Sequence, residues 1–199
     1  MHNQTKKNIK VGLIGFITIS IFALSGCGSS TNTTKTPVDE RSRLIDNTEF
    51  SVKIPREWDV IEPKDFTSDV PSETLIVFRN NVKNENFTVN VNIIKKNLQK
   101  PQDTLEFAKE VINRQKNGLL NYQQSKQDLT KMTVAGKQVD SYTMLFQAKK
   151  DVQSDSINFF QTYATKGNFG YIITGSYAGG ETSDNINIAQ TIVKSFGLK

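Results

Sequence analysis

Alternating apolar and polar positions predict strands in the first part of the chain. Between Phe50 and Pro55 every second residue is apolar, which indicates a strand with one buried face, and the proline ends it. Residues 74–79 form a short, more fully apolar strand. From residue 87 to 93 the alternation is regular, with Phe87, Val89, Val91 and Ile93 on one face and Thr88, Asn90 and Asn92 on the other. Such alternation is typical of an antiparallel sheet with one face in the core.

Two later segments have helical spacing instead. The first begins after Pro101, where Asp103 can cap the helix and Glu106 completes a capping box; its apolar stripe is Leu105, Ala108, Ile112, Leu119 and Tyr122. The second begins at Ser183 or Asp184, and its stripe is Ile186, Ala189, Ile192, Val193 and Phe196. Gly197 then suits a left-handed cap at the end of that helix.

Four more strand-like runs lie between these helices, at residues 128–133, 138–147, 156–165 and 169–177. Short turns at 135–137 and 166–168 join them in pairs, so consecutive strands must be antiparallel. The order is three strands, a helix, four strands and a helix. Because a sheet with an apolar face needs cover, we expect an α+β fold: a central antiparallel β-sheet flanked by helices in an α/β/α sandwich.

The start of the chain carries a different pattern. Three lysines precede an uncharged apolar run of 14 residues from Val11 to Leu24. At about 1.5 Å per residue this run is shorter than the roughly 30 Å core of a bilayer, so a secretory signal fits better than a permanent transmembrane helix.

The residues that end this run, Leu24, Ser25, Gly26 and Cys27, resemble a bacterial lipobox. The resemblance implies cleavage before Cys27, acylation of its sulfur by palmitate-like chains, and a lipid anchor on the outer, extracytoplasmic face of the cell membrane. Two acyl chains hold a protein on a membrane where one chain gives only marginal binding. The alternative is an uncleaved membrane anchor. Cys27 is the only cysteine, so an intramolecular disulfide is impossible.

Three parts follow from these patterns. Residues 1–26 are predicted to be a lipoprotein signal peptide and residues 27–40 a tether. Residues 28–37 are small and polar, so we expect this tether to be flexible. Residues 41–199 are long enough for one domain with its own core.

Charge and composition exclude several function classes. The chain has 25 basic and 20 acidic residues, and loss of the three signal lysines leaves 22 against 20, which does not indicate a nucleic-acid partner. The adjacent pairs Lys95–Lys96 and Lys149–Lys150 are interpreted as solvated strand ends, with anionic lipid headgroups as the alternative. The single histidine, His2, leaves with the signal. Catalysis by Ser-His-Asp or Cys-His, and zinc or haem bound through histidine, are therefore excluded.

These considerations predict no cofactor, no metal and no catalytic residue. Asp151 and Asp155 would bind calcium only if other ligands converged on them, because an EF-hand's alternating ligands and glycine are missing. Gly179–Gly180 lacks the neighbours of a phosphate-binding loop.

Several motifs in the domain resemble the PsbP-like proteins. Residues 50–58 have the pattern F-x-V-x-I-P-x-x-W, ending at Trp58. Gly136 in its hairpin, residues 163–171 (YATKGNFGY) and residues 192–196 (IVKSF) are also similar to that family. The resemblance runs from Phe50 to Phe196. It implies the fold that PsbP shares with the Ran-binding Mog protein and the DcrB-type bacterial lipoproteins, whose members are mostly non-enzymatic accessory or assembly factors. Photosystem binding does not transfer, because the basic extension and histidine contacts of the plant proteins have no counterpart here.

Three function classes remain open. The first is a monomeric, membrane-tethered, non-catalytic module that binds a protein partner or assists an envelope complex. The second is a small-ligand or carbohydrate-binding lipoprotein. The third is a hydrolase that uses carboxylates such as Glu106 or Asp140, although no paired constellation supports it. A polar pocket with two carboxylates of shifted pKa would favour the enzyme, and an exposed apolar patch would favour the partner-binding module.

Overall fold

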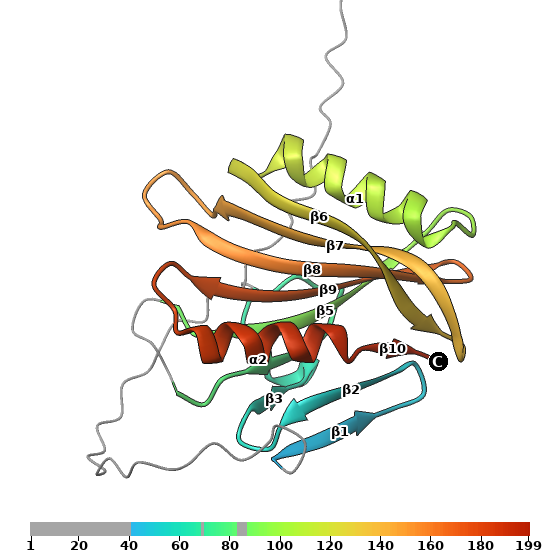
Figure 1. Cartoon of the computed structure of the whole chain (residues 1–199), viewed down its shortest axis with the longest axis horizontal. Coiled ribbons are helices and arrows are strands. Elements are labelled where there is room, and N and C mark those ends of the chain that lie inside the picture. The colour runs from blue at the N-terminus through green and yellow to red at the C-terminus, as the bar shows by residue number, and fades with distance from the viewer. Residues whose placement is uncertain (1–40, 69, 83–86) are drawn as a thin grey trace, which may run out of the picture.

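A computed structural model describes residues 41–68, 70–82 and 87–199, and the signal peptide, the tether and the lipobox lie outside this range. One ten-stranded sheet dominates the described chain, in the order β1-β2-β10-β6-β7-β8-β9-β5-β4-β3 (Figure 1). The strands are β1 (Ser42–Asp46), β2 (Phe50–Pro55), β3 (Asp59–Ile61), β4 (Thr74–Arg79), β5 (Asn90–Asn97), β6 (Leu120–Val134), β7 (Lys137–Lys149), β8 (Ile157–Lys166), β9 (Phe169–Ala178) and β10 (Gly197–Leu198). The helices are α1 (Thr104–Gly118), α2 (Ser183–Lys194) and the short 3-10 helix η1 (Pro63–Asp65).

The sheet is mixed rather than purely antiparallel. Every neighbouring pair is antiparallel except β10 with β6, where Gly197 and Leu198 run parallel to Thr133 and Val134. Gly197 therefore belongs to a strand, and the left-handed helix cap predicted for it is wrong, because its φ is not positive. β10 pairs with β2 on its other side and so joins the β1–β2 hairpin to the rest of the sheet.

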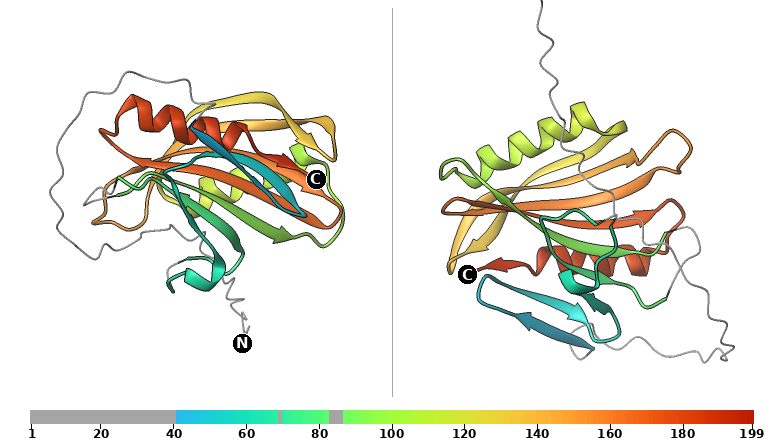
Figure 2. Two further views of the ribbon diagram at one scale, coloured as in Figure 1. Left: turned by 90° about the horizontal axis from the view of Figure 1, so that it is seen from below. Right: turned by 180° about the vertical axis from the view of Figure 1, so that it is seen from behind.

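Each helix packs against a different core cluster. On β8, Phe159 belongs to the cluster under α1 and Phe160 to the cluster under α2, as alternation along a strand requires. The α1 cluster also contains Phe107, Val111 and Met144. α2 lies between the β1–β2 hairpin and strands β5, β8 and β9, because the sheet curls around it (Figures 1 and 2).

The expected sandwich is present only in part. Two helices of 15 and 12 residues cannot cover ten strands, and much of β6 stays exposed on both faces. Among the described residues, no helix has the length and apolar character needed to cross a bilayer.

Local signals explain most of the elements. Asp103 caps α1, since its side chain accepts a hydrogen bond from the Leu105 amide at 2.8 Å. Gly136, with a φ of +75°, closes the tight turn between β6 and β7. Trp58, which ends the F-x-V-x-I-P-x-x-W motif, is buried in the α2 cluster.

Four boundaries differ from the prediction. β6 begins at Leu120, well before the expected residue 128. β5 begins at Asn90, and Phe87 packs on the α1 cluster while Val89, Val91 and Ile93 face the α2 cluster. The alternation thus fails at Phe87 because it precedes the strand. α1 ends at Gly118, so Tyr122, assigned to the helix, lies in β6. Similarly, Phe196 lies beyond the end of α2, which is Lys194.

Candidate functional site

The carboxylates suggested for catalysis have ordinary structural surroundings. Glu106 is exposed in the first turn of α1, and Asp140 on β7 forms an ion pair of 2.5 Å with Lys131. Neither lines one of the two cavities described below.

Asp151 closes a surface turn. Its side chain accepts hydrogen bonds from the amides of Gln153 and Ser154 at 2.9 and 2.7 Å, and the Ser154 hydrogen bond is the main cause that lowers the pKa of Asp151. Within the described ranges, no three side chains among His, Cys, Asp and Glu gather closely enough to hold a metal ion.

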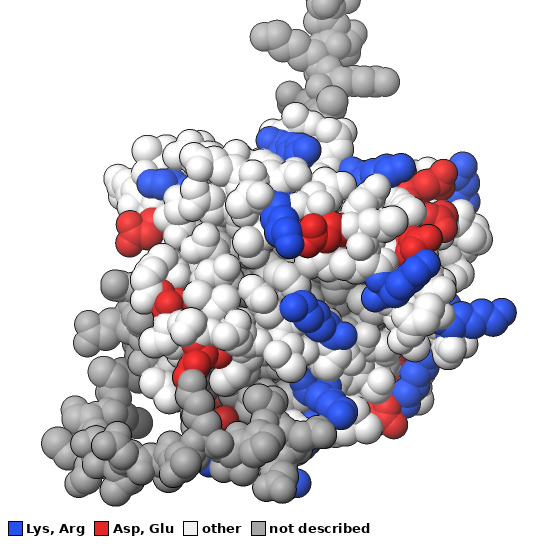
Figure 3. All heavy atoms as spheres, in the orientation of Figure 1, with Lys and Arg blue, Asp and Glu red and all other residues white. Residues whose placement is uncertain are grey.

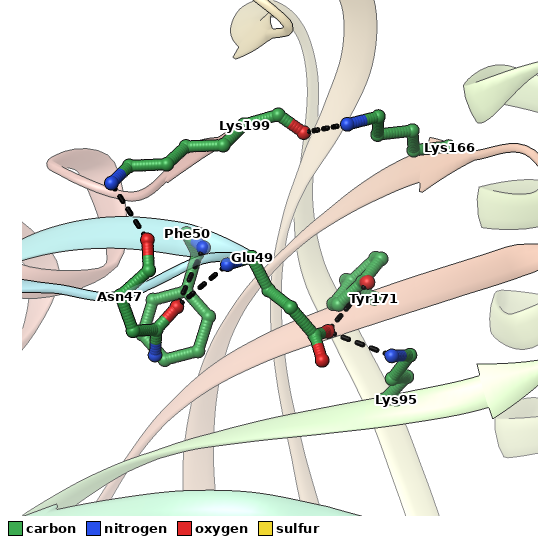
Figure 4. A network of polar contacts seen from close by, with 7 residues as sticks. All are labelled: Asn47, Glu49, Phe50, Lys95, Lys166, Tyr171 and Lys199. Atoms are coloured by element: carbon green, nitrogen blue, oxygen red, sulfur yellow. Dashed lines mark hydrogen bonds and ion pairs between the residues drawn. The ribbon is translucent and has the colours of Figure 1, made fainter.

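A polar cluster built on Glu49 links the β1–β2 turn to the centre of the sheet (Figure 4). One carboxylate oxygen of Glu49 accepts hydrogen bonds from Lys95 Nζ on β5 at 2.8 Å and from the Tyr171 hydroxyl on β9 at 2.9 Å. The Asn47 side chain accepts from the amides of Glu49 and Phe50, which fixes the turn. Lys95 also lies over the Phe169 ring, 4.2 Å from its centroid.

These contacts shift the pKa values in the cluster. The Lys95 hydrogen bond is the main cause that lowers the pKa of Glu49, and burial followed by the Glu49 contacts raises the pKa of Tyr171. Lys95 and Lys96, predicted as solvated strand ends, are ion-paired with Glu49 and Glu73. Basic and acidic side chains are dispersed over the face shown in Figure 3, with wide uncharged areas between them.

A hollow of about 400 Å³ lies beside this cluster. It is lined by Asn47, Thr48, Glu49, Phe50, Glu62, Pro63, Lys64, Leu75 and Ile76. Its lysine, Lys64, is paired with Glu62 at 3.0 Å. Since both partners of that pair are largely exposed, the pair contributes little to stability.

A second cavity, here called the β3–β4 cavity, has a volume of about 470 Å³. Its lining is Asp59, Val60, Ile61, Asp65, Phe66, Thr67, Val70, Val77 and Arg79. Arg79 Nη2 donates to Asp59 Oδ2 at 2.9 Å, and the Arg79 side chain is only 19% exposed. This volume lies within the range of small-molecule sites, roughly 300–1,000 Å³.

Polar residues continue inward from this cavity on the α1 face of the sheet. Strand register places Asn90 beside Arg79 and Asn92 beside Val77. The next neighbours on β9 are Ser176 and Thr174. All four of these inner residues are buried. The alternation of residues predicted that the two asparagines lie on the polar face of a half-buried strand. The structure shows that they are buried instead.

The inner end of this polar set contacts α1. Gln161 on β8 accepts hydrogen bonds from Gln115 Nε2 at 2.9 Å and from the Tyr163 hydroxyl at 2.6 Å, and it donates to Thr174 at 2.8 Å. Burial is the main cause that raises the pKa of Tyr163. Gln115, which interrupts the apolar stripe of α1 in the sequence, is therefore a buried link between the helix and the sheet.

β6 has a long uncovered edge that the sequence did not reveal. Within the described chain, β7 pairs along β6 but β10 pairs only with Thr133 and Val134. Val134 and Lys137 flank a two-residue turn and form a hydrogen-bonded pair. From Val134 back along β6, residues whose backbone N–H and C=O groups bond to β7 therefore alternate with residues whose groups do not. The backbone groups of Gln127, Leu129 and Lys131 consequently point away from β7. The Leu129 side chain is 63% exposed.

Comparison with known proteins identifies the fold. No protein-family model matches the sequence, and no curated protein matches it. The solution structure of cyanobacterial PsbP (CyanoP) from Synechocystis sp. PCC 6803 is similar at 12% identity with a TM-score of 0.54, covering 88% of this chain and 99% of that chain. LpqN of Mycobacterium tuberculosis, described as involved in cell envelope biogenesis, is similar at 12% identity and a TM-score of 0.51, covering 84% and 99%. The Ran-binding protein Mog1p of Saccharomyces cerevisiae gives 12% identity and a TM-score of 0.48, covering 79% and 95%. The first two likenesses establish that this chain adopts the PsbP-like fold that its sequence motifs resemble.

Proposed function

We propose that this protein is a lipid-anchored, extracytoplasmic binding module that engages a protein partner without catalysing a reaction. Two observations support the proposal independently of any particular binding surface. Leu24, Ser25, Gly26 and Cys27 resemble a lipobox, and by that resemblance Cys27 carries the lipid anchor after cleavage. The fold is similar to those of CyanoP and LpqN, and LpqN is described as acting in envelope biogenesis.

The uncovered edge of β6 is the observation that carries partner binding. An exposed strand edge presents unpaired backbone N–H and C=O groups, and a partner's extended segment can pair with them by strand addition. Gln127, Leu129 and Lys131 supply these groups over one continuous stretch. The exposed Leu129 side chain adds an apolar contact on the α1 face, where it lies opposite Tyr142.

The edge has features that select against indiscriminate pairing. Lys126 is ion-paired with Asp128 at 2.7 Å, and the β6–β7 register shifts between residues 120 and 123 and between 124 and 126. Charges and bulges of this kind restrict edge-to-edge aggregation. A partner must therefore tolerate charge beside its pairing segment, which favours a specific segment over any exposed strand.

Site-specific photo-cross-linking in living cells tests this proposal. A photoreactive amino acid replaces Leu129 in the full chain, and cross-linked membrane proteins are identified by mass spectrometry. The matched control places the same group at Glu106, which is exposed on α1. We expect a cross-linked product that forms from position 129 and not from position 106. Gln127→Pro should remove this product, because proline eliminates an outward N–H group. Equal products from both positions, or none from position 129, would refute strand addition at β6.

A further inference from the structure

The segment between β2 and β4 is acidic in a domain that is otherwise basic. Residues 57–73 contain six acidic residues and one basic residue, a formal charge of −5. Residues 41–199 as a whole contain 21 basic and 18 acidic residues, a formal charge of +3. The segment therefore has the opposite charge to the rest of the domain. Its β3 and η1 lie at one edge of the sheet, where they are open to solvent (Figure 2).

This segment lines both of the cavities described above. η1 contributes Asp65 to the β3–β4 cavity and Pro63 to the hollow beside Glu49, so the two cavities are neighbours on one surface. We call their combined lining the η1 surface. Each cavity has two carboxylates and one cation, which are Asp59, Asp65 and Arg79 in the first and Glu49, Glu62 and Lys64 in the second. The formal charge of each cavity is therefore −1.

The carboxylates of the η1 surface are accessible from outside. The side chains of Asp59, Glu49 and Glu62 are 44%, 38% and 56% exposed. Asp65 is also exposed, and it lies in the cavity lining next to Phe66. A ligand can thus contact all four carboxylates without any change in the buried core.

Apolar side chains stand beside these carboxylates. Ile61, Phe66 and Val70 line the β3–β4 cavity, are half-buried, and belong to neither of the two core clusters. A ligand that matches this lining has an apolar stem and a cationic head. Lysine and arginine side chains have this composition, since their aliphatic stems pack on apolar surface while the charged head stays near polar groups.

We propose that the η1 surface binds an extended segment of a partner protein that is rich in lysine or arginine, with one cationic side chain in each cavity. Charge complementarity selects this occupant, because an acidic surface attracts basic segments and repels anionic membranes and nucleic acids. Two cationic side chains on one segment bind more tightly than separate ones, since the second contact is intramolecular. The η1 surface shares no residue with the β6 edge, so the proposal does not depend on strand addition there.

Fluorescence anisotropy with rhodamine-labelled peptides provides the test. The full chain is purified in dodecyl maltoside, a nonionic detergent, and titrated into a peptide that alternates lysine with serine or a matched peptide that alternates glutamate with serine. We expect saturable binding of the lysine peptide that weakens as the ionic strength rises from about 0.01 M to about 1 M, because the Debye length falls from about 30 Å to about 3 Å. The glutamate peptide should not bind. It also controls for backbone pairing at β6, which does not require lysine side chains.

Charge variants with a matched control locate the site. The double variant Glu62→Gln, Asp65→Asn should weaken lysine-peptide binding about five- to tenfold, because one exposed ion pair contributes up to about fivefold. The control Glu106→Gln, Asp155→Asn removes the same two charges from exposed positions elsewhere and should change affinity less than about twofold.

A variant of the apolar wall separates binding in a cavity from general attraction between charges. Phe66→Ala leaves every charge in place and should weaken binding about fourfold, the effect of one buried methylene group. Val70→Thr keeps the shape of its side chain, tests the same wall, and should also weaken binding. Free n-butylamine, which reproduces a single lysine side chain, should displace the peptide only at concentrations at least about tenfold above the dissociation constant of the peptide.

Four outcomes would overturn the proposal. They are equal binding of the lysine and glutamate peptides, equal losses in the charge variant and its control, unchanged affinity in both Phe66→Ala and Val70→Thr, and displacement by n-butylamine as effective as by the peptide itself. The last outcome would indicate a site for a small organic cation instead. Cross-linking at position 129 reports on the β6 edge separately.

Discussion

Gly170 on β9 offers a direct test of how closely α1 packs on the sheet. A methyl group at Gly170 would lie 2.4 Å from Phe107 Cζ and 2.5 Å from Phe107 Cε2, far inside van der Waals contact. The Phe107 ring is fully buried and meets Tyr163 edge-on, with their centroids 6.5 Å apart. Relief therefore requires movement of a ring that its neighbours hold in place.

The expected cost of Gly170→Ala follows from this overlap. Overpacking a buried site costs typically 1–3 kcal/mol, and because the overlap involves an enclosed ring we expect about 3 kcal/mol. For a domain of this size, each kcal/mol lowers the melting temperature by about 2–4 °C, so the decrease should be about 6–12 °C. Circular dichroism melting of Gly170→Ala and its parent measures this difference.

Two comparisons make this reasoning refutable. Gly175→Ala on the same strand faces α2, where the added methyl would meet Val193 Cγ2 at 3.4 Å, so its effect should stay below about 1 kcal/mol. Phe107→Leu should partly rescue Gly170→Ala, which gives a favourable coupling in a double-mutant cycle. Equal melting temperatures for the two alanine variants, or simple additivity in the cycle, would show that α1 does not press on β9 at Gly170.

Four other predictions concern charge, metal, assembly and the anchor. The pKa of Glu49 is lowered, so its contribution to stability is present above the unfolded value and is lost as the pH falls through the folded value. Glu49→Gln should therefore lower the urea midpoint at neutral pH, and the difference should shrink below about pH 4; a constant difference would contradict the role of the Lys95 contact. Exhaustive chelation should leave the melting temperature unchanged, whereas a large decrease would point to a hard cation at Asp151 and Asp155. A chain beginning at Arg41 should melt cooperatively and sediment as a monomer, and a concentration-dependent dimer would contradict this. Mass spectrometry of membranes should find a diacylglyceryl peptide starting at Cys27; an unmodified Cys27 joined to an intact Val11–Leu24 run would instead indicate an N-terminal membrane anchor.

Local patterns predicted the elements whose signals are contained in their own residues. The alternation of Phe50, Val52 and Ile54 gave β2, and Asp103 marked the start of α1. Turns around Gly136 and Gly167 gave the two long hairpins. The PsbP-like motifs connected these elements into a fold, which the likeness to CyanoP confirms.

Elements that depend on distant partners could not be predicted in this way. β10 has only two residues, and nothing in Gly197 or Leu198 indicates pairing with β2 and β6. The same holds for β1, whose side chains are mostly exposed or half-buried. Both are strands because a neighbouring strand supplies their hydrogen bonds, not because of their own alternation.

The candidate sites were missed for a related reason. Asn90 and Asn92 are polar residues on the polar side of an alternating run, and alternation assigns such residues to solvent. They are buried because the α1 face of β5 is also covered. That cover comes from tertiary packing, which the residue pattern of a single strand does not reveal. The lone sequence signal was Gln115, a polar residue inside an apolar helix stripe.

The pairing of β10 determines when this protein can finish folding. Leu198 lies beside Phe50 on one strand and Val134 on another, so the sheet closes only after nearly the whole domain has been delivered. Contacts between such distant residues slow folding, although the added entropy of a longer loop is modest. Until residues 197 and 198 dock, β2 and the end of β6 expose bare edges together. A chain that crosses a membrane unfolded would pass through this open state on the far side, where its vulnerability to aggregation and proteolysis is greatest.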